Sequence, residues 1–290
     1  MDVADRLGDP RYAAASKLRP RWLRKHLAIP TEHGAWAMLL GPFAAGLGLA
    51  WQLDLAVLWA LIGMLLLFLA RQPMIILVKA LSGRRPRDDV QPALVWLTIY
   101  GGLALIPAAL LIAANRLEIF WLVLPALPAL AWQLWLVTRR AERQMTVELA
   151  GSGALALAAP AAYLAATGRL DSVAVSAWLL CWFQSVAAIV YVYLRLEQRR
   201  LSAMPARSLQ WVMGRRAVLY HTFNFVASSA LSAARVLPPL APLAFAAMLA
   251  EALRGVFRPA VGVKPQVLGL TQVAVTVVFV VLLVFAYRLS

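Results

Sequence analysis

The amino-acid sequence predicts an all-α fold, a polytopic transmembrane bundle of nine helices. Hydrophobic residues make up 62% of the chain and the mean hydropathy is +0.74. Nine apolar stretches of about 17 to 24 residues follow one another, and an α-helix of that length crosses the ~30 Å of hydrocarbon in a bilayer. A soluble domain of 290 residues has no use for so many apolar helices of this length.

The nine predicted spans are separated by connections of two kinds. The odd-numbered connections are very short, such as 52–54 and 115–116, whereas the even-numbered ones are longer and basic. We therefore expect any chemistry at the end of the bundle that carries the longer connections. The predicted spans are Ala35–Leu53, Leu55–Val78, Ala93–Ala114, Leu117–Val137, Val147–Ala166, Val173–Leu194, Ala217–Ala234, Leu240–Val256 and Val267–Tyr287.

Small residues and prolines predict how the helices pack. Small residues at a spacing of four let helices approach closely in lipid. Prolines inside spans are expected to kink their helices. The small-residue ridges are Ala150, Ala154, Ala158, Ala162 and Ala166 in the fifth span, with Gly41/Ala45 and Ala44/Gly48 in the first. The prolines are Pro107, Pro125, Pro128 and Pro160.

Positive charge is distributed unevenly between the two ends of the predicted bundle. Of the 28 Lys and Arg residues, 23 fall in the N-terminal tail and the even-numbered connections, and four fall on the other side. Because cytoplasmic loops carry an excess of Lys and Arg, we expect a cytoplasmic N-terminus and an outer C-terminus. The sequence thus predicts a multi-pass protein of the bacterial cytoplasmic (inner) membrane. Residues 1–27 would be a flexible basic tail, and residues 28–290 one transmembrane domain.

The composition argues against several classes of function. The net charge of +15 is explained by residues next to the membrane, so membrane lipids are the expected partners and nucleic acid is not. A single cysteine, Cys181, allows no intramolecular disulfide, and the three histidines lack the spacing of a zinc motif. We therefore predict no metal site, and no motif in the chain names a cofactor.

Arg71 is the candidate ligand-binding residue that most needs an explanation, because it lies within the second span. A charged side chain at the centre of a span costs roughly 2.5–3.5 kcal/mol on insertion scales. Arg71 lies ~12 Å deeper than Lys79, which ends the span and shares a face with Gln72. The guanidinium needs a carboxylate, carbonyl groups or an anionic ligand, and Glu32 and Glu148 are the nearest carboxylates by depth. A ligand site and an internal ion pair both stay open.

Further polar residues gather at the same end of other spans. Tyr191 and Arg195 lie along one side of the sixth span, and His221 and Asn224 share a face of the seventh. The functional interpretation is a basic cavity that opens at the cytoplasmic face and binds an anion through Arg71, Lys79 and Arg195. The other interpretation of Lys79 and Arg195 is that they are interfacial residues, which the topology alone explains.

The segment from Ile29 to Pro42, IPTEHGAWAMLLGP, resembles the opening signature of the YwiC-like family, a group of bacterial integral membrane proteins without an assigned reaction. We expect this resemblance to extend over residues 28–290. Within the segment, Glu32 and His33 form the one obvious acid–base pair, so they are the predicted catalytic residues. The alternative is a helix cap, with the carboxylate near the positive end of the helix dipole.

A more distant resemblance is to the UbiA-type prenyltransferases, which are nine-helix bundles with a cytoplasmic-side cavity. That resemblance implies a prenyl diphosphate held by Mg²⁺ between acidic motifs. Here Arg71, Gln72 and Lys79 stand where the first motif would be, and Tyr191 and Arg195 where the second would be. Without carboxylates for Mg²⁺, we expect Arg and Lys to clamp a phosphate directly.

Three functions follow from these observations. The first is binding of a phosphorylated lipid, prenyl diphosphate or quinone-like ligand by a divergent UbiA-like protein, in which Tyr191, His221 and Asn224 orient or protonate the ligand. The second is transport of a small anion or lipid. The third is a non-catalytic membrane scaffold. The sequence leaves open whether the protein is an enzyme.

Overall fold

The computed structural model describes residues 27, 29–30, 33–139 and 145–290. All the secondary structure in these ranges is helical, which confirms the predicted all-α class. Most of the predicted basic tail and Glu32 lie outside the described residues. Leu27 is fully buried and packs with Ile76 and Ala93 of the second and third predicted spans.

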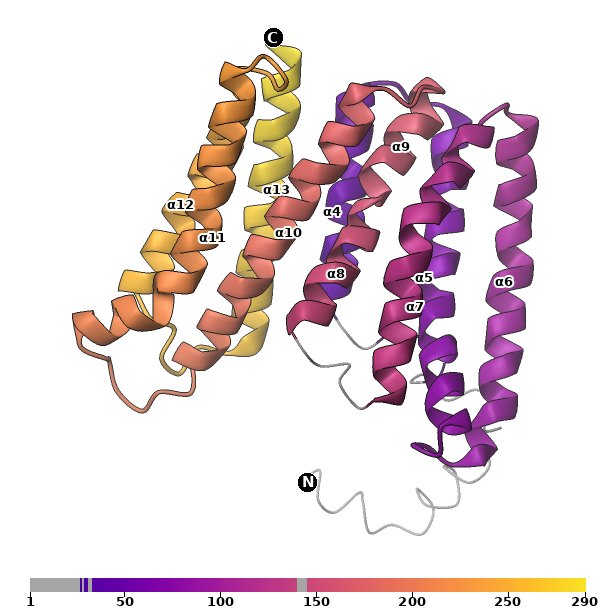
Figure 1. The fold of residues 1–290 in the computed structure, drawn as a ribbon, viewed down its shortest axis with the longest axis horizontal. Helices are drawn as coiled ribbons and strands as arrows, with labels where there is room; N and C mark the ends of the chain where they lie inside the picture. Colours follow the sequence, from indigo (N-terminus) through magenta and orange to yellow (C-terminus); the bar gives the residue numbers. More distant parts are fainter. Residues whose placement is uncertain (1–26, 28, 31–32, 140–144) are drawn as a thin grey trace, which may run out of the picture.

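Ten α-helices make up the described part of the chain (Figure 1). Short 3-10 turns, η2 (Arg87–Asp89) and η3 (Leu117–Leu122), lead into the third and fourth predicted spans. The α-helices are α4 (His33–Ala50), α5 (Leu55–Leu81), α6 (Val90–Ala113), α7 (Val123–Thr138), α8 (Met145–Ala156), α9 (Ala158–Thr167), α10 (Ser172–Gln198), α11 (Arg207–Ala233), α12 (Ala241–Phe257) and α13 (Pro265–Arg288).

Helices α8 and α9 together form the fifth predicted span, interrupted at Leu157. Pro160 explains the break, because it has no N–H to bond the carbonyl of Ala156 four residues earlier. Beyond the break, the backbone N–H of Ala161 donates to the Leu157 carbonyl at 3.0 Å, and the helix resumes. With α8 and α9 counted as one, the described helices correspond to the nine predicted spans.

Six of these helical segments are long and apolar enough, by length and composition, to cross a membrane. They are α5, η2 with α6, η3 with α7, α8 with α9, α10 and α13. Helix α4 is apolar but shorter, and α11 and α12 run alongside them in the same bundle (Figure 1). The structure therefore supports a multi-pass membrane protein.

Helix α4 stands at the centre of the bundle and packs against α9 and α13. A Cβ added to Gly46 would collide with the backbone carbonyl of Ala159 on α9, so only glycine allows this approach. The predicted ridge residues Gly41 and Gly48 instead face α13, at Thr276 and Val284. Small residues thus bring α4 close to both of its neighbours.

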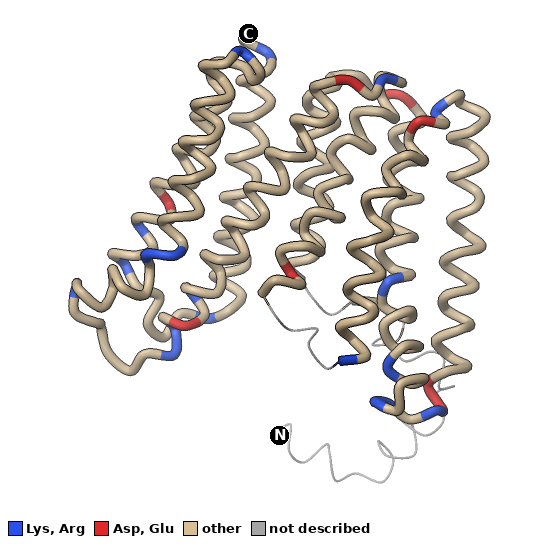
Figure 2. The backbone as a smooth tube through the Cα atoms, viewed as in Figure 1, with Lys and Arg blue, Asp and Glu red and all other residues tan. Residues whose placement is uncertain are grey.

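The two ends of the bundle differ in charge, as Figure 2 illustrates. At the end that holds the C-terminus, Arg116 pairs with Asp54 at 2.9 Å, and the Arg288 guanidinium lies 4.5 Å from the Trp51 ring centre. Most of the other described Lys and Arg residues lie at the opposite end, which we call the basic end. The predicted assignment of this end to the cytoplasm remains a prediction.

Helix α11 begins at Arg207, ten residues before the predicted span. The prediction placed Arg215 and Arg216 in a connection, whereas both are exposed side chains in the third turn of the helix. The side-chain amide of Gln210 donates to the Pro205 carbonyl at 2.8 Å and secures the helix start. The two arginines are accommodated because both side chains are exposed at the surface of the bundle.

Candidate ligand site

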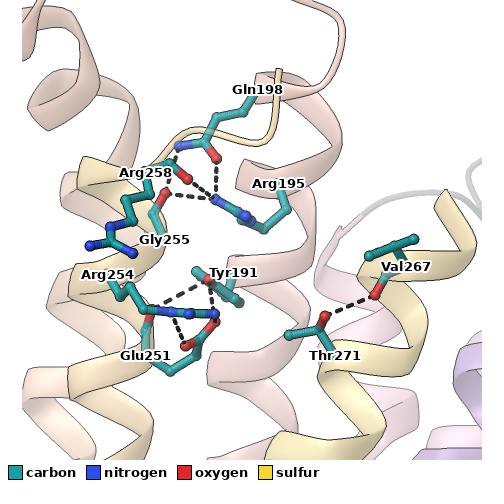
Figure 3. Close-up of polar contacts among 9 residues, drawn as sticks. All are labelled: Tyr191, Arg195, Gln198, Glu251, Arg254, Gly255, Arg258, Val267 and Thr271. Carbon is teal, nitrogen blue, oxygen red and sulfur yellow. Dashed lines mark hydrogen bonds and ion pairs between the residues drawn. The ribbon is translucent and has the colours of Figure 1, made fainter. Parts of the chain in front are cut away.

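The predicted ligand-binding residues lie on two sides of the bundle. Arg71, Gln72 and Lys79 are on α5, which packs against α6, α7 and α9. Tyr191 and Arg195 are on α10, and their side chains face α12 (Figure 3). His221 and Asn224 are on α11. Helices α4, α8 and α9 stand between the two sides (Figure 1), so the structure does not bring all these residues together.

On the α5 side, the Nε of Arg71 donates to Oε1 of Gln133 on α7 at 3.1 Å. Among side chains, only carboxylates were expected as its partners. One of them, Glu148, accepts a hydrogen bond from the Tyr193 hydroxyl at 3.0 Å, and the other, Glu32, lies outside the described residues. Gln133 is six residues before Arg139, at nearly the depth of Arg71. The comparison of depths that selected Glu32 and Glu148 would have identified Gln133 if amide side chains had been included.

The other α5 residues lie closer to the basic end. Lys79 is in the last turn of α5, and both Lys79 and Gln72 are half-buried. Nearby, Nη1 of Arg84 donates to the Val137 carbonyl in the last turn of α7. This contact ties the α5–α6 connection to α7. His33 opens α4, and its predicted catalytic role with Glu32 stays a prediction.

On the α10 side, Tyr191 reaches across to the last turns of α12 (Figure 3). Its hydroxyl donates to Oε1 of Glu251 at 3.2 Å, and the other oxygen of that carboxylate accepts from Nε of Arg254 at 2.8 Å. Tyr191 is buried, and a Cβ on Gly255 would overlap its hydroxyl. The absence of a side chain at Gly255 therefore lets the Tyr191 ring lie against α12.

Arg195 closes the end of α12 one turn further along α10 (Figure 3). Its Nη1 donates to the carbonyls of Gly255 and Arg258, each at 2.8 Å, and to Oε1 of Gln198 at 2.9 Å. The last carbonyls of a helix have no partner within the helix, so Arg195 satisfies groups that would otherwise be left unbonded. In this structure Arg195 acts as a helix cap.

Gln198 completes this cap, although it was not among the residues predicted from the sequence. It is fully buried, its side-chain amide donates to the Gly255 carbonyl at 3.2 Å, and its Oε1 accepts from the Ala260 backbone N–H at 3.3 Å. A glutamine three residues after Arg195 lies on the same helix face, which is the signal that could have identified it.

His221 is the polar side chain of this region that the fold leaves unexplained. Only 5% of it is exposed, and neither ring nitrogen has a hydrogen-bond partner among the described residues. The backbone of Ala187 on α10 faces the ring without a hydrogen bond of normal geometry. The Tyr191 ring meets it edge-on, with 6.1 Å between ring centres. The imidazole thus lies buried between α11 and α10, and neither nitrogen has a hydrogen bond of normal geometry among the described residues.

The polar residues continue from His221 toward the middle of the bundle. One turn further, the side-chain amide of Asn224 donates to the Phe183 carbonyl of α10 at 2.8 Å. Gln184 is buried next to Phe183, and its amide lies 3.4 Å from the Thr276 hydroxyl on α13. The predicted pair His221 and Asn224 thus shares a buried face of α11, in line with its spacing of three.

The first part of the chain matches a known family. Residues 29–163 match the family described as YwiC-like protein. The resemblance read from the opening segment is therefore confirmed, and the matched YwiC-like region runs from the start of α4 into α9. The match ends at residue 163, short of the predicted 290, so α10 to α13 lie beyond it. No curated protein and no solved structure matches the chain. The UbiA-type resemblance stays a prediction.

Proposed function

We propose that this protein is a lipid-binding membrane protein, and that α10, α11 and α12 hold the hydrogen-bonding head group of a quinone-like or other isoprenoid lipid. The observation that carries the proposal is His221, a buried imidazole without a described partner for either nitrogen. A buried polar group without a hydrogen bond costs roughly 1–3 kcal/mol. A ligand that accepts from one nitrogen or donates to the other would remove that cost for the nitrogen that it bonds.

An uncharged head group fits this region better than a phosphate. Arg195 lies over the Tyr191 ring, and its Nη1 already donates to three oxygen atoms of the protein. A phosphate would have to displace these bonds and uncap α12. A carbonyl or hydroxyl group next to His221 requires no such rearrangement. The charged ligands expected from the sequence, a phosphorylated lipid or prenyl diphosphate, are better matched to Arg71 and Lys79 on α5.

The proposal includes an orientation in the membrane. We assign the basic end to the cytoplasm of a bacterial cell, because Lys and Arg are retained on that side. The α5–α6 and α10–α11 connections would then lie in the cytoplasm, and the head-group site would open toward the inner leaflet. The test of this part is the labelling of cysteines introduced at Gly83 and Gly168 by a membrane-impermeant thiol reagent in intact cells. Labelling at Gly168 alone is expected, and labelling at Gly83 alone would reverse the orientation.

The binding experiment uses purified full-length protein in a mild detergent, with a labelled, short-tailed isoprenoid benzoquinone as the probe. We expect saturable binding to the wild type. His221→Leu should weaken it about tenfold, since a lost hydrogen bond of about 1.4 kcal/mol corresponds to that factor. Ser229→Ala is the matched control, because Ser229 bonds within its own helix, to the Phe225 carbonyl at 2.8 Å. Absence of saturable binding, or equal affinity of His221→Leu, would rule the proposal out.

Transport is a second candidate, favoured by the break between α8 and α9. Interrupted helices line the substrate sites of many transporters, where freed backbone groups meet the substrate. Pro160→Ala would restore the missing N–H and close the break. In liposomes with a fluorescent phospholipid, a transporter moves the unchanged lipid between leaflets, and Pro160→Ala should slow it. A wild-type rate equal to that of empty liposomes would exclude lipid transport.

A further inference from the structure

One ridge of α11 changes from charged to apolar along its length. It consists of exposed residues at a spacing of four, each a neighbour of the next but about 40° further around the helix, so that the ridge winds along α11: Arg207, Trp211, Arg215, Leu219 and Phe223. All five side chains are exposed, with Trp211 at 47% and Leu219 at 66%. The two arginines are near the basic end, and the apolar pair follows toward the middle of the bundle. We call this set the α11 ridge.

The last turns of α12 extend the charged part of the α11 ridge sideways. The rings of Trp211 and Phe257 are stacked, with 6.4 Å between centres and 11° between planes. Beneath them the helices touch, because a Cβ on Gly214 would collide with Val256. Arg254 and Arg258 are exposed, on either side of Phe257. Figure 2 shows Lys and Arg positions gathered at these two helix ends.

The nearby acidic groups do not neutralise the arginines of the α11 ridge and of the end of α12. Glu251 is the one Asp or Glu between residues 207 and 258. It already accepts from Arg254 at 2.8 Å and from Tyr191 at 3.2 Å. In the described part of the chain, the side chains of Arg207, Arg215 and Arg258 form no ion pair. Three guanidinium groups therefore surround an exposed aromatic stack without a counter-charge from the described residues.

We propose that the α11 ridge and the end of α12 form a binding site for an anionic phospholipid of the leaflet at the basic end. Guanidinium groups bind phosphate oxygens in pairs, and tryptophan favours the head-group level of a membrane. Leu219 and Phe223 continue along the same ridge at the depth of the acyl chains. The part of the ridge that holds two arginines and a tryptophan is followed by an apolar part, which matches the order of head group and acyl chains in a phospholipid.

This site is distinct from the one proposed at His221. His221 and Asn224 are buried, whereas all five residues of the α11 ridge are exposed. An experiment that rules out one of the two sites leaves the other unaffected. The chemistry differs as well, because the ridge requires a negative charge on the lipid and His221 requires a hydrogen-bonding group.

The test is a titration of delipidated full-length protein with phosphatidylglycerol, followed by native mass spectrometry, and with phosphatidylcholine as the control lipid of no net charge. The combined variant Arg207→Gln, Arg215→Gln, Arg258→Gln should bind phosphatidylglycerol about 100-fold more weakly, as each basic residue contributes about a factor of five. Arg215→Gln alone should weaken it several-fold, and this single surface change keeps the test valid if the combined variant fails to fold.

Arg216→Gln is the matched control. It removes the same charge from the same helix turn, but Arg216 lies ~100° around the helix from Arg215 and off the ridge. We expect it to bind phosphatidylglycerol like the wild type. Equal losses in Arg215→Gln and Arg216→Gln would indicate general charge attraction and overturn the site. Displacement of the lipid by an equal concentration of glycerol phosphate would overturn the lipid as its occupant.

Discussion

Helices α4 and α9 meet through small apolar residues, whereas α10 and α11 bury several polar side chains beside the apolar core that they share with α12. Gly46 and Ala159 bring the first pair into backbone contact within the YwiC-like region. Among the described residues, the buried polar side chains are Ser152 on α8 and seven more on α10 and α11: Gln184, Ser185, Gln198, Gln210, His221, Asn224 and Ser228. Close packing in lipid needs small residues, and buried polar groups in a membrane protein are candidates for functional sites unless, like Gln198 and Gln210, they bond the ends of helices. The comparison therefore separates a scaffold from a candidate site.

The largest loss of stability is expected where α4 and α9 approach each other most closely. Gly46→Ala places a methyl group against the Ala159 carbonyl, and a backbone atom cannot rotate away. We expect a loss of about 3 kcal/mol or more in the free energy of unfolding, measured by thermal unfolding in detergent. Gly101→Ala on α6 is the control, because a Cβ there meets no atom within 4 Å. Similar melting temperatures for the two variants would contradict the close approach of α4 and α9.

The second largest loss of stability is expected at the cap of α12. Arg195→Gln removes the donor shared by the Gly255 and Arg258 carbonyls, each 2.8 Å away. We expect a loss of about 2 kcal/mol in the free energy of unfolding, as for a hydrogen bond from a charged group. The control is Arg200→Gln, because Arg200 is exposed and its loss should cost less than about 0.5 kcal/mol. Equal melting temperatures would mean that α12 does not depend on Arg195.

A smaller effect is expected where Tyr191 lies against α12. Gly255→Ala places a methyl group on the Tyr191 hydroxyl, which can move away at the cost of its bonds to Glu251. We expect a loss of about 1–2 kcal/mol, less than for Gly46→Ala, because a side chain yields more easily than a backbone. Tyr191→Leu should remove most of the penalty of Gly255→Ala when the two changes are combined. Additive losses in this double-mutant cycle would contradict the contact.

The smallest of these losses is expected at the end opposite the basic one. Asp54→Asn removes the ion pair with Arg116 but keeps an oxygen that can accept from the Ala56 backbone N–H. Because the pair is partly exposed, we expect a loss of less than about 1 kcal/mol, and less still at high salt. Thermal unfolding at low and high salt measures both. A loss as large as that of Arg195→Gln would mean that the ion pair of Asp54 and Arg116 stabilises the protein as much as the cap of α12 does.

The sequence predicts the parts of the fold that depend on hydrophobicity and misses those that depend on a particular partner. The helical segments follow from apolar length, and six of them are long and apolar enough to cross a membrane, since burial in lipid needs no specific neighbour. The start of α11 at Arg207 was missed because a helix with one polar face and exposed arginines has low hydropathy. Gly46 was missed because close approach depends on which helix is opposite. Gln133 was missed because carboxylates were the side chains considered as partners of Arg71.

The candidate site was predicted in part. Tyr191, His221 and Asn224 were chosen because polar residues inside spans need an explanation, and the structure places His221 and Asn224 on the buried face of α11 with Tyr191 beside His221. The pairing of Tyr191 with Glu251 and the cap formed by Gln198 depend on how α12 lies against α10. A linear pattern carries no information on that arrangement, so the sequence could not place them.

Thermal unfolding of the ligand-free wild type and of His221→Leu decides whether the polar interior of α10 to α12 serves a ligand or the fold. Leucine fills a similar volume and removes two buried nitrogens that have no described partner. We predict that the variant is as stable as the wild type or more stable by up to ~2 kcal/mol, and that added quinone raises the melting temperature of the wild type alone. A less stable variant whose melting temperature still rises with quinone would refute a ligand role for His221.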